Sequence, residues 1–415
     1  MALKLDMSKA YDRVEWEFLA KVMFRMGFCP RWINWIMNCV TSVSYAVNFN
    51  GEKTGFIRPT RGLRQGDPLS PYLFLICAEG FTSLLKQANG QGRLSGLKVA
   101  RGAPRLSHLF FADDSLIFCK ANGEEAGQLR MILEAYERAS GQKINIEKSS
   151  IFFSRNVKEV HKRRVLAELQ GMRQVLQSKY LGLPLVIGRS KRQVFEFIRQ
   201  KTTARLTGWK EKLLSHAGKE ILLKSVVMAL PTYVMSCCLL PQSLCREICS
   251  EMARFWWGQK EAEQRIHWLK WGKLTEVKAD GGLGFRELSE FNLALLAKQL
   301  WRLLTRPNLL VSRVMKARYF KGRSIWDTKA ASGDSWCWKS LLSAKDLLEE
   351  GTRKRIGDGK SINIWLDRWL PCAEDGRIKS RRREGMKVQK VCELIRDGKW
   401  DRELVKQVFE EEEGR

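Results

Sequence analysis

The chain carries two kinds of hydrophobic periodicity, and the shorter period appears in its opening residues. Apolar side chains at positions 3, 5 and 7 alternate with Lys4 and Asp6. A period of two is typical of a strand with one buried face. The pattern therefore predicts a short strand whose polar face carries Asp6.

A second strand pattern surrounds two adjacent acidic residues. Residues 106–112 and 115–119 are rich in apolar and aromatic side chains. They predict a hairpin with Asp113 and Asp114 at its turn. Asp is a common turn former, so this pair taken alone favours an ordinary structural turn.

Helical periodicity follows the polar loop that lies between these acidic positions. Apolar residues recur at helical spacing after residue 68, and they predict a helix over 68–87. Asp67 is a suitable N-cap and Pro68 a suitable first helical residue. The helix's apolar stripe is explained by core packing, whereas the glycine-containing loop 61–67 is expected to contact a substrate.

The two periodicities divide the chain unevenly. Residues 1–187 alternate strand and helix patterns, whereas the chain from Ser190 onward is mostly helical, with a strong amphipathic helix at 291–304. The pattern predicts an α+β region followed by largely α-helical ones. At 415 residues, two to three domains are expected.

The charge balance indicates a polyanionic partner. The 73 Lys and Arg residues exceed the 45 Asp and Glu residues, giving a formal net charge of +28. The excess is concentrated between Arg155 and Lys224, where seventeen basic residues face five acidic ones. Such a surplus favours nucleic-acid binding that weakens as the salt concentration rises.

The remaining features concern location. The eleven cysteines show no disulfide pattern, and the cysteines between 237 and 249 lack the paired spacing of a zinc site. The longest apolar stretch, 226–241, is interrupted by Pro231 and is short for a membrane span. No secretory signal opens the chain. We expect an intracellular protein of the nucleus or cytoplasm, not secreted and without membrane contact; the basic run 379–383 is a weak candidate nuclear address.

Several motifs resemble one known family. The runs LDMSKAYD (5–12), RGLRQGDPLSPYLF (61–74), FADDSLIF (111–118) and GQKINIEKS (141–149) look like successive palm motifs of reverse transcriptases. The resemblance is strongest to non-LTR (LINE-type) retrotransposons, particularly plant ones. Four later runs resemble the same elements: 180–191, 208–237, 279–304 and 355–371. Eight similar runs in order span almost the whole chain.

The resemblance implies an architecture and a reaction. The expected architecture is a palm with an antiparallel sheet and packed helices at 1–187, an all-α thumb at 188–300 and a Trp-rich helical connector at 301–415. The expected reaction is RNA-directed DNA synthesis from an RNA template, a DNA primer and a deoxynucleoside triphosphate. The cofactor is expected to be two Mg²⁺ ions, with Mn²⁺ as a possible substitute.

The resemblance also implies residue roles. Asp6 and Asp113 match the carboxylates that bridge both metal ions, and Asp114 matches a third that is less directly bound. Tyr11 matches the aromatic gate against a sugar 2′-hydroxyl. Lys148 matches a general acid for the pyrophosphate leaving group.

Further positions match residues that contact the nucleic acid. Gln65 and Gly66 match loop residues that line the nascent base pair. The turn Tyr180-Leu181-Gly182 matches a primer grip. Arg189, Lys191 and Arg192 are expected to contact the nucleic-acid backbone.

One departure from the family keeps other readings open. The chain begins on the first catalytic strand, so it resembles an N-terminally truncated fragment without the fingers that precede this strand in the family. Nucleotide binding is then expected to be weak, because triphosphate contacts are lost. The alternatives are an inactive retrotransposon remnant or a maturase-like scaffold that binds structured RNA.

Overall fold

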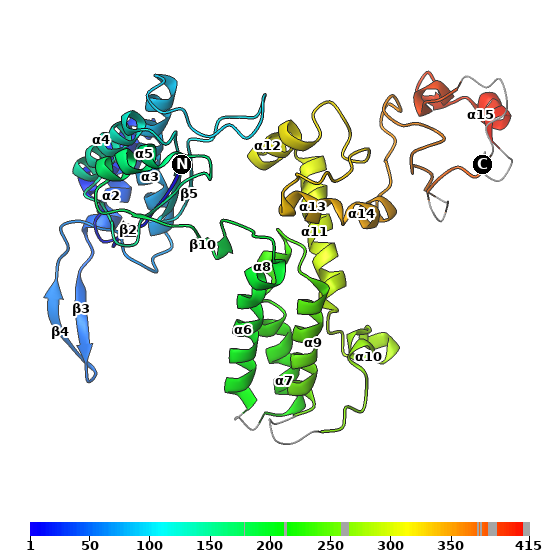
Figure 1. Ribbon diagram of the computed structural model, residues 1–415, viewed down its shortest axis with the longest axis horizontal. Helices are drawn as coiled ribbons and strands as arrows, with labels where there is room; N and C mark the ends of the chain where they lie inside the picture. The colour runs from blue at the N-terminus through cyan, green and yellow to red at the C-terminus, as the bar shows by residue number, and fades with distance from the viewer. Residues whose placement is uncertain are drawn as a thin grey trace. The chain divides into compact units, whose positions relative to one another are not determined.

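The structure divides into two compact units, which are described separately (Figure 1). It is a computed structural model that describes residues 1–177, 179–210, 214–258, 265–371, 373, 376–380 and 388–409. Unit 1 contains residues 1–187 and 313–321, and unit 2 contains residues 188–312 and 322–415.

Unit 1 is built around a five-stranded sheet in the order β5-β6-β1-β8-β9. The central strand β1 (Ala2–Leu5) pairs antiparallel with β6 (Asp114–Phe118) and with β8 (Ser150–Phe152). β5 (His108–Phe111) forms the expected hairpin with β6, and β9 (Arg173–Gln174) runs parallel to β8. Leu3 and Leu5 are fully buried, which confirms the alternation predicted for the first strand.

Five helices share the core of unit 1 with this sheet. They are α1 (Trp16–Arg25), α2 (Pro30–Thr41), α3 (Ser70–Gly90), α4 (Gly123–Ser140) and α5 (Glu159–Glu168). α1 packs on α2 and α3, and α4 packs on α3 and α5. Leu73, Phe81 and Leu85 of α3 are buried, which confirms that its apolar stripe belongs to the core.

The start of α3 differs from the predicted one. Its N-cap is Leu69, which makes no side-chain cap, and Pro71 lies in the first turn. Asp67 is not the N-cap, because its Oδ1 accepts a hydrogen bond from the Leu69 N–H at 2.7 Å and forms a separate turn just before the helix.

Three short strand pairs complete unit 1. β2 (Met7–Ser8) pairs with β7 (Lys143–Ile144), and β10 (Lys179–Tyr180) pairs with β11 (Leu183–Pro184). The hairpin of β3 (Tyr45–Phe49) and β4 (Glu52–Ile57) was not predicted, and it extends away from the helices of this unit (Figure 1).

Unit 2 is mainly helical up to residue 351. α6 (Lys191–Lys210) and α9 (Gln242–Trp256) lie side by side, with α7 (His216–Leu222) against α9 (Figure 1). A π-helical turn (Leu223–Val227) and α8 (Thr232–Met235) follow α7, while α10 (Trp271–Thr275) and a 3-10 turn (Lys278–Asp280) follow α9. These elements agree with the helical pattern expected after Ser190.

The later helices of this region group around α11 (Leu288–Thr305), which confirms the amphipathic helix predicted at 291–304. It contacts α8, α9, α13 (Trp336–Leu342) and α14 (Lys345–Gly351). α12 (Leu310–Tyr319) groups with unit 1 from Arg313 onward. The expected domain boundary at residue 300 lies within α11.

The part of the expected connector that follows α14 is largely irregular. Residues 352–390 contain no helix in their described part. A 3-10 turn (Val391–Leu394), the hairpin β12 (Ile395–Arg396)–β13 (Lys399–Trp400) and α15 (Arg402–Val408) follow. Indole N–H groups bind backbone here: Trp365 Nε1 donates to the Val388 carbonyl and Trp369 Nε1 to the Ile364 carbonyl, each at 3.0 Å. These tryptophans therefore organise irregular backbone rather than a helix.

Two further expectations from the sequence concern a membrane span and the basic run 379–383. No helix in the described ranges combines the length and the apolar content that crossing a bilayer requires. Within the basic run 379–383, Arg381, Arg382 and Arg383 lie outside the described residues.

Candidate active site

The pairing of β1 with β6 brings the acidic motifs together. Leu5 pairs with Ser115, so continuing the antiparallel register by one step sets Asp6 beside Asp114. Asp113 lies in the two-residue loop between β5 and β6. The three acidic residues that were predicted as metal ligands therefore lie near one end of the adjacent strands β1 and β6.

The loop between β5 and β6 has an unusual backbone. Ala112 has φ +50° without being glycine, a conformation that costs of order 1 kcal/mol for an L-residue. The neighbouring strand pairs hold it there, because Phe111 pairs with Asp114 across the turn. The turn thus presents Asp113 in a conformation fixed by the surrounding sheet.

The fourth motif supports the first through the Asp6 backbone. The Asp6 N–H donates to Ser149 Oγ at 3.2 Å, and the Asp6 carbonyl accepts from the Asn145 N–H at 2.8 Å. Ser149 is buried. The loop 145–149 therefore holds both the N–H and the carbonyl of Asp6. The backbone of Asp6 is fixed, and its carboxylate takes no part in these two bonds.

Lys148 belongs to that same supporting loop. Its backbone N–H donates to Asn145 Oδ1 at 3.3 Å, and its side chain is exposed. Asn145 thus contacts both Asp6 and Lys148. The structure links the predicted general acid to the acidic site through one short loop.

Tyr11 is fixed near the acidic residues by stacking. Its ring lies on that of Phe74, with the centroids 4.8 Å apart and an interplanar angle of 17°. The Tyr11 carbonyl accepts a hydrogen bond from the Leu63 N–H at 2.8 Å. Burial and, secondarily, the charge of Asp113 raise the pKa of Tyr11 above its usual value of 10.0, so the phenol stays protonated at neutral pH.

The loop with Gln65 and Gly66 has a fixed base and an exposed tip. At the base, the Gly62 N–H donates to the Val14 carbonyl at 2.8 Å, and Trp16 Nε1 donates to the Gly62 carbonyl at 2.7 Å. At the tip, both Gln65 and Gly66 are exposed. The polar tip is accessible to a ligand, and its contact with a substrate stays a prediction.

The expected grip residues form the turn of the β10–β11 hairpin. Leu181 has φ +49° and Gly182 has φ +78°, so both central residues are in the left-handed region. Tyr180 Oη donates to the Leu109 carbonyl on β5 at 3.3 Å. The turn is therefore attached to the sheet that carries Asp113 and Asp114.

Sequence analysis missed Lys4 as a residue of this site. Lys4 Nζ lies 3.9 Å from Asp114 Oδ1 and donates to the Lys179 carbonyl at 3.0 Å. The alternation of apolar and polar residues in the first strand could have indicated it, because a period of two places Lys4 on the same strand face as Asp6. The acidic site and the β10–β11 hairpin thus share one ammonium group.

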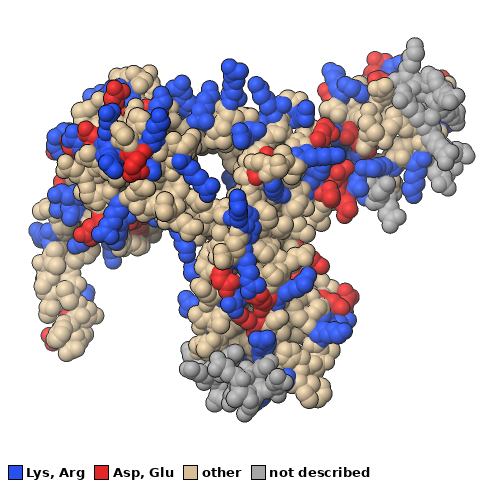
Figure 2. Space-filling model, viewed as in Figure 1, with Lys and Arg blue, Asp and Glu red and all other residues tan. Residues whose placement is uncertain are grey.

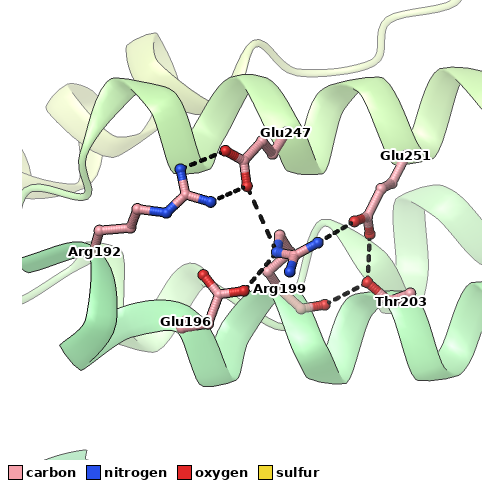
Figure 3. Close-up of polar contacts among 6 residues, drawn as sticks. All are labelled: Arg192, Glu196, Arg199, Thr203, Glu247 and Glu251. Carbon is pink, nitrogen blue, oxygen red and sulfur yellow. Dashed lines mark hydrogen bonds and ion pairs between the residues drawn. The ribbon is translucent and has the colours of Figure 1, made fainter.

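The three basic residues expected to bind nucleic acid differ in their surroundings. Arg192 makes a bidentate ion pair with Glu247 of α9 at 2.6 and 2.9 Å (Figure 3). Lys191 Nζ donates to the Gly188 carbonyl and lies 5.2 Å from the Trp336 ring centroid. Arg189 is exposed and makes no ion pair with any described residue. Of the three, Arg189 is the most available to a phosphate.

Arg199 extends the α6–α9 ion-pair network. Its guanidinium contacts Glu196, Glu247 and Glu251 at 2.6, 3.6 and 3.2 Å (Figure 3). Thr203 Oγ1 also donates to Glu251 at 2.7 Å. We define Arg192, Glu196, Arg199, Thr203, Glu247 and Glu251 as the α6–α9 network. The arginines of this network pair with glutamates of α6 and α9 and so hold the two helices together. Other Lys and Arg side chains are spread over both units on the face shown in Figure 2.

The acidic site does not form a complete metal cage by itself. In the part of the chain that the structure describes, no group of three or more His, Cys, Asp or Glu side chains is arranged to hold a metal ion. Asp114 is directed instead to Lys4. A metal ion at Asp6 and Asp113 would need further oxygen ligands from water or substrate.

Comparisons with known proteins agree with the motifs. A family model described as "Reverse transcriptase (RNA-dependent DNA polymerase)" matches residues 1–185. An uncharacterized mitochondrial protein of Arabidopsis thaliana is 44% identical over 144 residues, which is 34% of this chain and 94% of that protein.

Two relatives are proteins of mobile elements. The uncharacterized 149 kDa protein of transposon TX1 from Xenopus laevis is 27% identical over 287 residues, 68% of this chain and 21% of that protein. A Pol polyprotein from the type-1 retrotransposable element R2 of Popillia japonica is 30% identical over 147 residues, 35% of this chain and 23% of that protein. The chain therefore spans less than a quarter of either.

Among solved structures, telomerase from Candida albicans in complex with a fragment of telomeric RNA shows a low similarity. The TM-score is 0.36 at 12% identity, with 84% of this chain and 47% of that chain covered.

Proposed function

We propose that this chain, which belongs to the reverse transcriptase family of the non-LTR retrotransposon type, catalyses RNA-directed DNA synthesis at Asp6, Asp113 and Asp114. The observation that carries the proposal is the β1–β6 register, which sets Asp6 beside the acidic turn. Two segments far apart in the sequence would thereby contribute oxygen ligands to one metal site. The reaction is transfer of a nucleotidyl group to a primer 3′-hydroxyl.

The carboxylates of the site would supply part of the oxygen ligands of a divalent metal ion. Mg²⁺ is commonly held by one or two carboxylates together with substrate phosphates and waters, so a full protein cage is not required. Asp6 and Asp113 would hold the ions, with Asp114 nearby as the third carboxylate. Bound there, the ions would lower the pKa of the primer hydroxyl and offset charge on the triphosphate.

Tyr11 and the polar loop are proposed to select and place the incoming nucleotide. The Tyr11 ring is stacked on Phe74 and cannot turn aside easily, so it would exclude a sugar with a 2′-hydroxyl. Its raised pKa keeps the phenol neutral beside the triphosphate. The exposed Gln65 and Gly66 would line the nascent base pair.

Lys148 is proposed to act on the pyrophosphate leaving group, and the β10–β11 turn on the primer end. The exposed Lys148 ammonium would donate a proton to the pyrophosphate as it leaves. The turn Tyr180-Leu181-Gly182 would hold the primer end, since Tyr180 is anchored on β5 next to the acidic turn.

We further propose that unit 2 holds the thumb and the connector, and that both units bind the template and primer duplex. The net charge of +28 supports this role. Arg189 is the preferred phosphate contact among the three basic residues at the start of unit 2. The described cysteines are free thiols, which fits a reducing compartment such as the nucleus or cytoplasm.

The decisive experiment is Mg²⁺-dependent extension of a DNA primer on an RNA template. Asp113→Asn should reduce extension by about a thousandfold or more, because the substitution removes a carboxylate that neutralises metal charge. Glu147→Gln is the matched control, because it removes an exposed carboxylate from the supporting loop. Its extension should stay within about twofold of wild type, as expected for a surface substitution.

The same assay separates polymerase from RNA-binding scaffold. Wild-type extension in Asp113→Asn would disprove the catalytic assignment. Tight, salt-sensitive RNA binding by a wild-type chain that extends no primer would support the scaffold instead. An unchanged circular dichroism melt of Asp113→Asn is required in either case, so that a folding defect is not mistaken for a lost carboxylate.

A further inference from the structure

Lys4 lies between the acidic site and the β10–β11 hairpin. Its ammonium is 3.9 Å from Asp114 Oδ1 and donates a hydrogen bond to the Lys179 carbonyl at 3.0 Å. The first contact is to a proposed metal ligand. The second is to the strand that leads into the proposed primer-holding turn.

Lys4 lies on the central strand of the five-stranded sheet of unit 1. Lys4 pairs with Leu116 on β6 and with Ser150 on β8, so its backbone is fixed on both sides. The flanking Leu3 and Leu5 are fully buried. The Lys4 side chain therefore leaves the sheet on the same face as Asp6, only two residues away.

The surroundings of Lys4 strengthen its interactions. Its side chain is 24% exposed and that of Asp114 is 32% exposed. Ion pairs that are partly shielded from water exceed the strength of fully exposed ones. Because Asp6, Asp113 and Asp114 repel one another, the ammonium lowers the electrostatic cost of bringing them together.

The β10–β11 hairpin depends on such external contacts. It consists of only two pairs of residues, Lys179 with Pro184 and Tyr180 with Leu183. A hairpin this short is unstable in water unless other parts of the protein hold it. Lys4 provides one anchor to the sheet, and Tyr180 Oη on the Leu109 carbonyl provides another.

We propose that Lys4 is a positioning residue that ties the third carboxylate of the acidic site to the primer-holding turn. This inference rests on the function proposed above. Through Lys179, Lys4 keeps the turn at a fixed place beside the carboxylates. Through Asp114, it competes with a divalent cation for the same carboxylate. The Lys4 side chain thereby affects both the position of the turn that holds the primer end and the affinity of the carboxylates for a metal ion.

Three measurements on the full chain test this role without relying on turnover. Mn²⁺ binding is followed by electron paramagnetic resonance and primer–template binding by fluorescence anisotropy. The mobility of residues 179–184 is followed by hydrogen exchange at their backbone N–H groups, which all of them except Pro184 possess. The variants are Lys4→Met, which removes the ammonium, and Lys4→Arg, which keeps a cation. Lys143→Met is the matched control, because it removes an exposed lysine from the neighbouring short strand β7.

Lys4→Met should bind Mn²⁺ about three- to tenfold more tightly, because a competing positive charge is gone. It should bind primer–template about three- to tenfold more weakly and exchange the amides of 179–184 faster, because one charge-assisted hydrogen bond is lost. Lys4→Arg should restore primer–template binding to within about twofold. Lys143→Met should leave Mn²⁺ binding and exchange unchanged.

The outcomes separate this inference from the function itself. Unchanged exchange over 179–184 in Lys4→Met, or Mn²⁺ binding that weakens, would overturn the role of Lys4. The expected shifts in a chain that extends no primer would support the role of Lys4 while refuting polymerisation. A wild-type chain that binds neither Mn²⁺ nor primer–template would overturn both. If Lys4→Met does not fold, Lys4→Gln takes its place: tighter Mn²⁺ binding with faster exchange over 179–184 would support the role of Lys4, and unchanged values would overturn it.

Discussion

The two units hold their polar residues in place by different means. In unit 1, backbone pairing sets Asp6 beside Asp114, and buried Ser149 supports the Asp6 backbone. In unit 2, the α6–α9 network aligns two helices through side chains that are largely at the surface. Backbone register is specified by every residue of a strand pair, whereas an ion pair depends on two side chains. Unit 1 should therefore be more sensitive to backbone changes, and unit 2 to charge and salt.

The largest difference in the free energy of unfolding is expected between alanine substitutions of two glycines in one loop of unit 1. A Cβ on Gly62 (φ +94°) would lie 2.7 Å from the Asp12 carbonyl oxygen, whereas a Cβ on Gly66 (φ +86°) meets nothing within 4 Å. Gly62→Ala should lower the free energy of unfolding by about 3 kcal/mol and Gly66→Ala by about 1 kcal/mol, since only the first adds a clash to the backbone strain. Urea unfolding measures both. Equal losses would show that the Asp12 contact does not constrain the loop.

A smaller effect is expected from breaking the α6–α9 network. Glu247→Ala should lower the free energy of unfolding by about 1 kcal/mol, because a bidentate but partly exposed pair is lost. The loss should shrink in 0.5 M salt, since exposed charges are screened (about 4 Å Debye length). Glu350→Ala, an exposed carboxylate on α14, is the control and should change the value by less than about 0.5 kcal/mol. A salt-independent loss for Glu247→Ala would assign it to packing instead.

The smallest effect is expected for Arg189. Its substitution should change RNA binding but not stability, whereas substitution of the nearby Arg192 should change stability as well. Arg189→Glu should weaken salt-sensitive RNA binding about fivefold, as expected for one phosphate contact, and leave the free energy of unfolding within about 0.5 kcal/mol. Arg192→Glu should lower the free energy of unfolding as well, because it faces Glu247. Parallel anisotropy and urea experiments decide the matter. Equal stability losses would mean that the ion pair with Glu247 has no role in unit 2.

The parts predicted from sequence are those in which one segment carries its own pattern. The alternation around Asp6, the apolar arms of the β5–β6 hairpin and the stripe of α11 each contain enough periodic residues to define an element. The order of the motifs gave the family. The shared role of Asp6 and the acidic turn was implied only by the resemblance to the family, since neither pattern alone indicates that the two segments are neighbours.

The missed parts depend on partners far along the chain. Arg192 looked like a free cation because Glu247 lies 55 residues later, on a different helix. Lys4 looked like an ordinary exposed strand residue, since neither Asp114 nor Lys179 is near it in sequence. The β3–β4 hairpin was missed despite its Asn50-Gly51 turn, because its strands are almost wholly exposed and lack a buried alternation. The irregular backbone after α14 was not predicted, because Trp365 and Trp369 bind backbone carbonyls there, whereas Trp336 and Trp338 belong to helix α13.

The central place of β1 has a consequence for how the protein is made. Leu3 pairs with Ile117 on one side and with Ile151 on the other. At a ribosomal rate of roughly 5–20 residues per second, the second partner follows Leu3 by roughly 7–30 s. Until then β1 lacks at least one of the two strands that pair with it, which favours chaperone binding or aggregation. The strand that carries the first carboxylate is thus synthesised well before the strands that complete its burial.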